Sequence, residues 1–349
     1  MTNSLISMET TMTKIQATLI PGDGIGPEIT EAVTAILDHM GSPFDWDVQQ
    51  GGVSALDATG SPLPEATLDS IRRTKLALKG PLTTPVGGGF KSINLQLRQA
   101  FNLYANVRPT KTIKADGRFD NVDMVIFREN LEGYYISDEG YMEHNGDPEG
   151  KVFSTGYNTK EGAQRITRAA FEYALANGRK KVSIVHKANI LKLLSGMFLE
   201  EARKVALEYE GRVDFDERIV DACAMQMVMY PDAFDVIVTT NLFGDILSDL
   251  AAGLVGGLGL APGANIGKDA AIFEAVHGSA PDIAGQQKAN PCAFLMAAGL
   301  MLEHVGKTDD AQRLKKAVIE TVQAKDRVTP DLGGTGNTMS IAEAIMDRL

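Results

Sequence analysis

The chain has 349 residues, 44% apolar and 23% charged, a balance typical of a globular protein with a sizeable core. Its 34 basic and 45 acidic residues give a formal net charge of -11, which argues against nucleic acid or an anionic membrane as the main partner. No apolar run approaches the length of a membrane span.

The first fourteen residues are polar, rich in Thr and Met, and contain neither an apolar signal core nor an arginine. They support neither secretion nor organelle import, so we expect a disordered tail, with Met12 as an alternative start. The two cysteines, Cys223 and Cys292, form no CxxC pair, which suits a reducing compartment. We therefore expect a cytoplasmic protein.

Apolar strand-like runs alternate with amphipathic helical stretches along the chain. Strands are expected at 15–22, 122–130, 181–189 and 234–241, helices at 27–40, 190–209 and 244–257, and an irregular acidic, Gly-rich segment at 133–157. This alternation predicts a mostly parallel sheet covered by helices, with ligands at the carboxyl ends of its strands. Arg128, Lys187 and Asp245 all fall near such ends, so we expect them to converge.

The stretch "IPGDGIGPEI" at 20–29 joins the first strand to the first helix. It does not fit the GxGxxG dinucleotide pattern, because Pro27 and Ile29 stand where a third glycine would be needed. The better interpretation is a tight turn with positive φ, followed by a helix with Pro27 at its first position.

Polar and basic side chains are concentrated between residues 79 and 108: Lys79, Thr83, Thr84, Ser92, Asn94, Arg98 and Arg108. Arg98, Arg108 and the later Arg128 offer planar groups suited to bidentate carboxylate binding. In an acidic chain, three arginines near one site suggest a di- or tricarboxylate ligand. The alternative is that each arginine forms an ordinary surface ion pair.

Asp245 and Asp249 lie four residues apart in the helical stretch "NLFGDILSDLAAG". Like charges at this spacing repel, and a hard divalent cation would relieve the repulsion. Asp221 is a third acidic candidate. The alternative, that the aspartates are helix N-terminal charges stabilised by the dipole, suits Asp245 better than Asp249.

Three further residues have both a catalytic and a structural interpretation. Tyr135 is a candidate proton donor or a core aromatic, and Lys187 is a base with a lowered pKa or a solvated charge. Asp282, in the loop "HGSAPDIAGQQKANP", would select an unmodified ribose over a 2′-phosphate, or belongs to a polar turn.

Taken together, these segments resemble the decarboxylating β-hydroxyacid dehydrogenases, the family of isocitrate, isopropylmalate, homoisocitrate and tartrate dehydrogenases. The matches "IPGDGIGPE", "RENLEG", "VHKANI", "HGSAPDIAGQQKANP" and "TPDLGGTGNT" occur in family order. The resemblance implies an α/β fold of the isocitrate/isopropylmalate dehydrogenase type, without a GxGxxG fingerprint. It divides the chain into a large cofactor-side domain (1–103 plus 256–349), a small domain (104–132 plus 160–255) and a dimer clasp (133–159).

The resemblance also implies residue roles. It makes Tyr135 and Lys187 catalytic, with Lys187 donated by the other subunit of a homodimer. It gives substrate binding to Lys79, Ser92, Asn94, Arg98, Arg108, Arg128 and Asn189. It gives Mg²⁺ or Mn²⁺ binding to Asp245 and Asp249, with Asp221 contributed across the dimer. It gives cofactor binding to Thr83, Thr84, Glu274, His277, Gly278, Asp282, Ile283, Asn290 and Asp331. NADP-dependent relatives have Lys and Tyr in place of Asp282 and Ile283, so NAD is the expected cofactor.

The segment "KSINLQLR" discriminates best among the family's substrates. It resembles isocitrate dehydrogenases, in which Ser92 and Asn94 would bind the distal carboxylate. An isopropyl group would leave both unpaired, at about 1–3 kcal/mol each. The expected reaction is NAD-dependent oxidative decarboxylation of isocitrate to 2-oxoglutarate and CO₂. Homoisocitrate, one methylene longer, is the alternative, ahead of isopropylmalate and tartrate. A non-catalytic regulatory role ranks low, because the catalytic and metal residues are retained.

Overall fold

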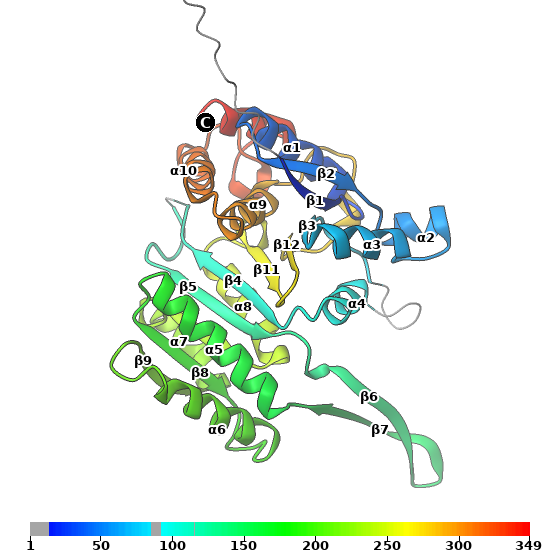
Figure 1. Ribbon diagram of the computed structural model, residues 1–349, viewed down its shortest axis with the longest axis vertical. Coiled ribbons are helices and arrows are strands. Elements are labelled where there is room, and N and C mark those ends of the chain that lie inside the picture. Colours follow the sequence, from blue (N-terminus) through cyan, green and yellow to red (C-terminus); the bar gives the residue numbers. More distant parts are fainter. Residues whose placement is uncertain (1–13, 85–91, 115) are drawn as a thin grey trace, which may run out of the picture.

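The structure is a computed structural model that describes residues 14–84, 92–114 and 116–349. The expected tail and most of the Gly-rich stretch after Thr84 lie outside the described residues. The main element is a ten-stranded sheet in the order β2-β1-β3-β12-β11-β4-β5-β10-β8-β9 (Figure 1). In that order the strands are Phe44–Val48, Ile15–Ile20, Leu76–Lys79, Ala271–Ala275, Pro262–Ile266, Ala105–Lys111, Asp123–Glu129, Val236–Thr239, Lys181–His186 and Asp214–Ile219.

The sheet is parallel on both flanks and antiparallel at its centre. β12–β11, β11–β4 and β4–β5 are antiparallel, whereas the pairs outside them are parallel. The prediction of a mostly parallel sheet is therefore confirmed, and the antiparallel centre is a feature that it did not include. The pairs β4–β5 and β11–β12 are antiparallel because their connections, at 112–122 and 267–270, are shorter than the crossover of a dozen or more residues that a parallel pair needs.

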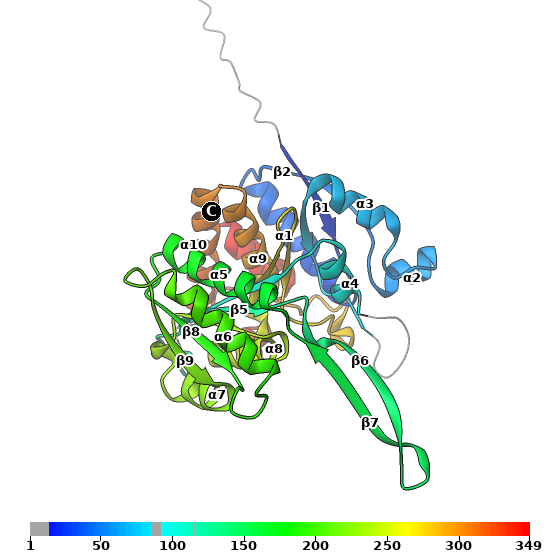
Figure 2. The ribbon, with the colours of Figure 1, turned by 60° about the horizontal axis from the view of Figure 1, so that its bottom comes forward.

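Helices cover both faces of the sheet (Figures 1 and 2). They are α1 (Gly26–His39), α2 (Val53–Thr59), α3 (Glu65–Thr74), α4 (Ile93–Ala100), α5 (Lys160–Ala176), α6 (Leu194–Leu207), α7 (Val220–Met229), α8 (Asn241–Leu254), α9 (Cys292–His304), α10 (Thr308–Ala324) and α11 (Thr338–Met346). In the described ranges, none of these combines the length and the apolar character that crossing a bilayer requires. Both cysteines are buried free thiols.

The core is divided among several clusters. The largest joins α1 from the start of the chain to α9, α10 and α11 from its end, with Ile29, Phe294 and Ile345 all fully buried. A second packs α5 and α6 against one face of the β5–β10–β8 strands, and a third packs α7 and α8 against the other face. The clusters follow the chain segments of the expected domains, but the domain boundaries themselves stay a prediction.

The "IPGDGIGPEI" stretch forms the predicted turn and helix. Gly22 and Gly24 have φ of 83° and 59°, a region that glycine occupies without strain. A β-carbon at Gly24 would lie 2.0 Å from the carbonyl oxygen of Ser279, so the turn also packs against the distant "HGSAPD" loop. The turn interpretation is confirmed.

The segment expected to be irregular is instead an ordered hairpin, β6 (Gly133–His144) and β7 (Asp147–Tyr157), which projects from the molecule (Figures 1 and 2). The prediction was wrong because both faces of the hairpin are exposed, which removes the alternation of apolar and polar residues that marks a half-buried strand. Apolar side chains also lie open on it, with Tyr141 and Val152 each 63% exposed.

Two buried carboxylates hold the base of this hairpin. Glu132 accepts hydrogen bonds from the backbone N–H and hydroxyl of Thr159, at 2.6 and 2.5 Å, and so joins the two strand ends. Glu129 accepts the backbone N–H groups of Leu131 and Glu132, at 3.0 and 2.6 Å. Burial, partly opposed by these bonds and reinforced by Glu132, raises the pKa of Glu129 to about 7.

We expect the stability of the chain to fall as pH rises from Glu129's ordinary pKa of 4.5 to its folded-state pKa of about 7. The folded-state pKa of about 7 lies above the ordinary value of 4.5, so this contribution is present at low pH and is lost as pH rises through that window. Thermal unfolding of Glu129→Gln between about pH 5 and pH 8 should show a flatter profile than the wild type. Glu139→Gln, on the exposed hairpin, is the matched control. Parallel profiles for Glu129→Gln and wild type would contradict the assignment.

Candidate active site

A cleft of about 410 Å³ opens between the hairpin base, α4, α8 and the centre of the sheet. We call it the acid-binding cleft. Its walls contain these predicted site residues: Lys79, Thr84, Ser92, Asn94, Arg98, Arg108, Arg128, Tyr135, Asp245, Glu274, His277 and Gly278. Residues far apart in the sequence are thus brought together, as the strand-end argument predicts for Arg128 and Asp245.

The three arginines are buried in this cleft. Arg98, Arg108 and Arg128 are 8%, 7% and 1% exposed, so the surface ion-pair interpretation is wrong for all three. Burial, with Arg108 and Arg98 nearby, lowers the pKa of Arg128 to about 9. So much positive charge in one buried space favours a ligand with several carboxylates.

Asp245 is the anion that faces these arginines. It forms an ion pair with Arg128, and its Oδ1 atom lies 3.2 Å from Nη1 of Arg108. Burial raises the pKa of Asp245, but Arg128 and Arg108 outweigh that effect, so its pKa lies below the ordinary value. The same Nη1 atom of Arg108 lies 3.6 Å from Asp249. Arg108 therefore already relieves the repulsion between Asp245 and Asp249. The repulsion alone does not require a metal ion.

Tyr135 lies over the cleft with its hydroxyl directed at Asp245. The hydroxyl donates a hydrogen bond to Oδ2 of Asp245, and the Arg128 guanidinium stacks 4.7 Å from the ring centre. Burial, then the bond to Asp245, raises the pKa of Tyr135, so the hydroxyl keeps its proton at neutral pH. The ring is 39% exposed, which excludes the core-aromatic interpretation.

The distal wall of the cleft contains Ser92 and Asn94. Ser92 caps α4 by accepting the backbone N–H of Leu95 at 3.4 Å, so it also has a structural role. Among the described residues, Oδ1 of Asn94 and Nε of Arg98 are buried without a hydrogen-bond partner. An acceptor and a donor left open at one wall fit a polar ligand better than an apolar one.

Lys187, Asn189 and Asp221 do not line the acid-binding cleft. Lys187 instead forms an ion pair with Asp221, which lowers the pKa of the Asp221 carboxyl. The expectation that Lys187 converges with Arg128 and Asp245 is therefore wrong within one chain. The strand order explains it: β10 lies between β5, which carries Arg128, and β8, which leads to Lys187.

The metal prediction can be compared with this geometry. Asp245 and Asp249 present hard oxygen donors that converge on one atom of Arg108, which fits part of a divalent-cation site. Across the described ranges, no three His, Cys, Asp or Glu side chains are grouped closely enough to hold a metal ion. Within one chain, Asp245 and Asp249 lie together, whereas the third predicted ligand, Asp221, lies elsewhere beside Lys187.

A second cleft of about 420 Å³, here called the cofactor cleft, adjoins the first. His277 and Gly278 line both, and the second is also lined by Ile25, Gly259, Ala280, Ile283, Lys288, Ala289, Asn290 and Asp331. Asn290 donates to Asp331 over 2.9 Å. Burial lowers the pKa of His277, whose Nε2 atom is buried without a partner among the described residues. Asp282 is exposed beside Ile283.

The loops around both clefts are tied together by Asp23, which sequence reasoning missed. Its carboxylate accepts the backbone N–H of Thr83 at 2.8 Å and that of Ser54 at 3.2 Å. The Thr83 hydroxyl in turn lies 2.7 Å from that of Ser279. Thr83 therefore helps to fix the loops, whereas the neighbouring Thr84 lines the acid-binding cleft.

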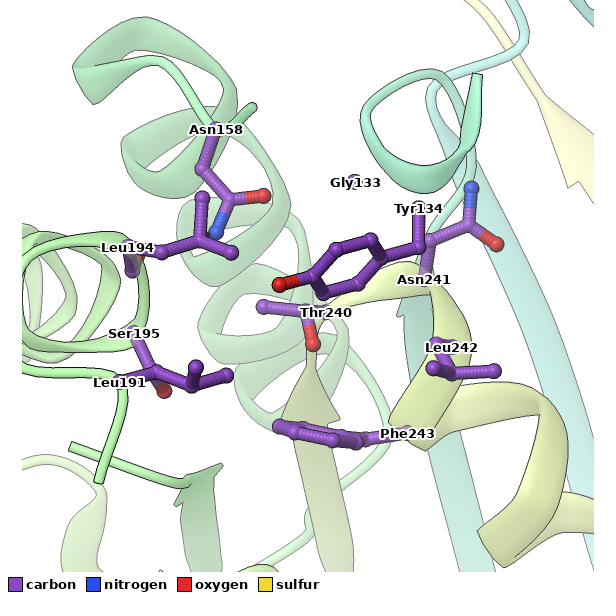
Figure 3. A pocket seen from close by; sticks show the side chains of 10 residues that line it. All are labelled: Gly133, Tyr134, Asn158, Leu191, Leu194, Ser195, Thr240, Asn241, Leu242 and Phe243. Carbon is purple, nitrogen blue, oxygen red and sulfur yellow. Dashed lines mark hydrogen bonds between the residues drawn. The ribbon is translucent and has the colours of Figure 1, made fainter. Parts of the chain in front are cut away.

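A third cavity lies on the far side of the hairpin base, where the Tyr134 ring and Phe243 face Leu191 and Leu194 (Figure 3). Its volume of about 20 Å³ is little more than a water molecule needs. The two larger clefts are the better candidates for ligand binding.

Other polar residues that hold the site were also missed. Asn241 accepts two hydrogen bonds from Arg128, at 2.8 and 3.1 Å, and donates to the carbonyl oxygen of Glu132 at 3.0 Å. Ser248 accepts from Arg108 at 2.5 Å. Their position on α8, in register with Asp245, was the signal available in the sequence.

An acid-binding cleft with a protonated tyrosine, joined to a second cleft on an α/β scaffold, is typical of an enzyme that acts on a small polycarboxylic acid. The isocitrate/isopropylmalate dehydrogenase family matches residues 16–345. The chain belongs to this family, as the sequence resemblance predicted.

Individual relatives extend the comparison. A crystal structure of isocitrate dehydrogenase from Methylococcus capsulatus is 54% identical, with a TM-score of 0.92, and the match covers 95% of this chain and 98% of that one. Catalytic subunit 5 of the mitochondrial NAD isocitrate dehydrogenase of Arabidopsis thaliana is 45% identical over 97% of this chain and 89% of the relative. A regulatory subunit of the mitochondrial NAD isocitrate dehydrogenase of Dictyostelium discoideum is 43% identical over 99% of this chain and 96% of the relative.

Proposed function

We propose that the chain catalyses the NAD-dependent oxidative decarboxylation of isocitrate to 2-oxoglutarate and CO₂. The observation that carries the proposal is the convergence of three buried arginines, Tyr135 and Asp245 in one cleft. The names of the Methylococcus and Arabidopsis relatives support the same activity. Three arginines suit a tricarboxylate, because each guanidinium can donate hydrogen bonds to a carboxylate.

The residues of the cleft have distinct roles in this reaction. Arg98, Arg108 and Arg128 bind the carboxylates and hold the acid beside the cofactor cleft. Tyr135, whose raised pKa keeps its hydroxyl protonated, gives its proton to the carbon that loses CO₂. The adjoining cleft would hold NAD, which would supply the hydride acceptor for the carbon that carries the hydroxyl. His277 and Gly278, which line both clefts, lie at the boundary between the two reactants.

In this proposal, a second copy of the chain in a homodimer supplies the base and the third metal ligand that the acid-binding cleft lacks in one chain. Lys187 of that copy takes the hydroxyl proton, and its Asp221 joins Asp245 and Asp249 as ligands of Mg²⁺ or Mn²⁺. The bound cation would polarise the C2 oxygen and stabilise the charge that develops as CO₂ leaves. The exposed apolar side chains of the β6–β7 hairpin support a contact surface there.

The preference for NAD rests on Asp282, whose carboxylate would repel a 2′-phosphate. The double change Asp282→Lys with Ile283→Tyr should raise the NADP-to-NAD ratio of kcat/KM roughly tenfold to a hundredfold, because a charge-assisted contact replaces a repulsion. Asp269→Lys, an equal charge change in the β11–β12 loop, is the control and should leave the ratio unaltered. An unchanged ratio in the double variant would exclude Asp282 as the discriminating group.

The substrate is decided by steady-state assays with isocitrate, homoisocitrate, isopropylmalate and tartrate, each with NAD and with NADP. Isocitrate with NAD should give the largest kcat/KM. Homoisocitrate is the second candidate, because one methylene changes binding by only about 1–3 kcal/mol. A higher kcat/KM for any rival acid would overturn the substrate, and activity only with a second polypeptide would favour a role as one component of a hetero-oligomer.

The cellular compartment of the protein is either the cytoplasm or the mitochondrion in this proposal. The cytoplasmic location expected from the polar N-terminal segment finds no support in the Arabidopsis and Dictyostelium relatives, whose names place them in mitochondria. Fractionation of cells that express the full chain would decide between these locations.

A further inference from the structure

A line of buried polar side chains crosses the centre of the sheet beneath the acid-binding cleft. It begins at the ion pair of Lys79 and Glu274, whose Nζ and Oε2 atoms are 2.7 Å apart, and it ends at Arg108. Between them, Asn265 of β11 and Asn106 of β4 lie directly opposite each other in the antiparallel register. All five side chains are buried, so bulk water does not satisfy their polar groups.

Hydrogen bonds join these side chains without a break. Nε of Arg108 donates to Oδ1 of Asn106 over 2.6 Å. Nδ2 of Asn106 donates to Oδ1 of Asn265 over 2.7 Å, and Nδ2 of Asn265 donates to Oε1 of Glu274 over 2.7 Å. Donation therefore runs in one direction from a cation to an anion, and we call this set the buried hydrogen-bond chain.

The two ends of the chain fix the orientation of both amides. A guanidinium only donates and a carboxylate only accepts. Burial alone raises the pKa of Glu274, but Lys79 and Arg98 outweigh it and hold that pKa at about 2. If either amide were flipped, two donors or two acceptors would face each other, so the arrangement is determined. In a low-dielectric interior each bond also strengthens the next.

We propose that Asn265 is a positioning residue of the acid-binding site. Acting through Asn106, it holds the Arg108 guanidinium in the orientation that binds a substrate carboxylate, and it links Arg108 to the Lys79–Glu274 pair. Neither amide lines the acid-binding cleft, so any effect on the ligand passes through the ends of the hydrogen-bond chain that do, Arg108 and Glu274. The proposal rests on the function proposed above, and it concerns how this site is held rather than which acid it takes.

The variant Asn265→Asp tests this role with almost no change in shape. It puts an oxygen where the amide nitrogen faces Glu274, so the hydrogen-bond chain is broken by two facing acceptors. We expect KM for isocitrate to rise roughly tenfold to a hundredfold, and KM for NAD to change less than about twofold. The dissociation constant of isocitrate, measured by calorimetry without NAD, should rise by the same factor. Asn106→Ala, on β4, removes the oxygen that accepts from Nε of Arg108 and should raise the KM for isocitrate in the same way. This second variant keeps the test available if Asn265→Asp folds poorly.

A double-mutant cycle separates positioning from a general loss of packing. Lysine at position 108 has no Nε donor, so in an Arg108→Lys background Asn265→Asp should alter the KM for isocitrate less than about twofold. Asn337→Asp, which keeps the N-cap acceptor of α11, is the matched control and should change neither KM. Equal increases in both KM values, or full additivity with Arg108→Lys, would overturn the proposal. A wild-type chain that prefers another acid would refute only the proposed function, because the same cycle can be measured with that acid.

Discussion

Replacing Tyr135 with phenylalanine is expected to lower kcat by roughly 10²- to 10⁴-fold while the KM for isocitrate changes less than about threefold. The hydroxyl is the group that holds a proton over the cleft, because burial and the bond to Asp245 raise its pKa. The ring itself would keep its stacking with Arg128, so binding should be largely preserved.

Tyr134 provides the control for that prediction. It is the neighbouring residue on β6, and its side chain faces the small third cavity instead of the acid-binding cleft (Figure 3). Tyr134→Phe should therefore leave kcat within about twofold of the wild type. Equal losses in the two variants, or a KM effect without a kcat effect in Tyr135→Phe, would show that Tyr135 does not donate the proton.

Replacing Asp245 with asparagine should weaken both metal binding and the fold. Calorimetric titration with Mn²⁺ in the absence of NAD should show that the affinity for Mn²⁺ falls roughly tenfold to a hundredfold. Urea unfolding should show a loss of about 1–3 kcal/mol, because Arg108 and Arg128 lose the anion that they share. The pKa of Arg128, already low, would be expected to fall further.

Asp249→Asn separates the two effects of Asp245. The Asp249 side chain is 55% exposed and its contact with Arg108 is 3.6 Å, so its loss should cost less than about 1 kcal/mol of stability. The affinity of the Asp249→Asn variant for Mn²⁺ should nevertheless fall as much as that of Asp245→Asn. If Mn²⁺ affinity is unchanged in both variants, the aspartates serve only the arginines and the proposed metal site is wrong.

Much of the site was predictable because its residues follow strands or begin helices. Arg128 is the second-last residue of the buried strand β5, Asp245 lies in the first turns of α8, which follows β10, and the parallel pairing of β5 and β10 brings the two together. In the sequence, the only sign that the three arginines form a binding site was the presence of Ser, Asn and Thr residues near them. The structure supplies the burial that excludes surface pairing.

What the sequence could not predict depends on strand order and on pairing across the sheet. Lys187 follows a strand as Arg128 does, but the intervening β10 keeps it out of the cleft. Asn265 and Asn106 are 159 residues apart, and only the antiparallel β11–β4 pair makes them partners. A polar residue inside the short run "PGANI" was the only local signal. The β6–β7 hairpin was missed because its strands bury neither face.

We propose that isocitrate and NAD react in a site built from two copies of this chain, with Tyr135 from one and Lys187 from the other. A mixed dimer of Tyr135→Phe and Lys187→Met chains, co-expressed with different tags and purified through both, tests it directly. Each variant alone should be nearly inactive. The mixed dimer should recover about half of the wild-type activity, because one of its two sites contains both intact side chains. A mixed dimer as inactive as its parents would contradict the shared site.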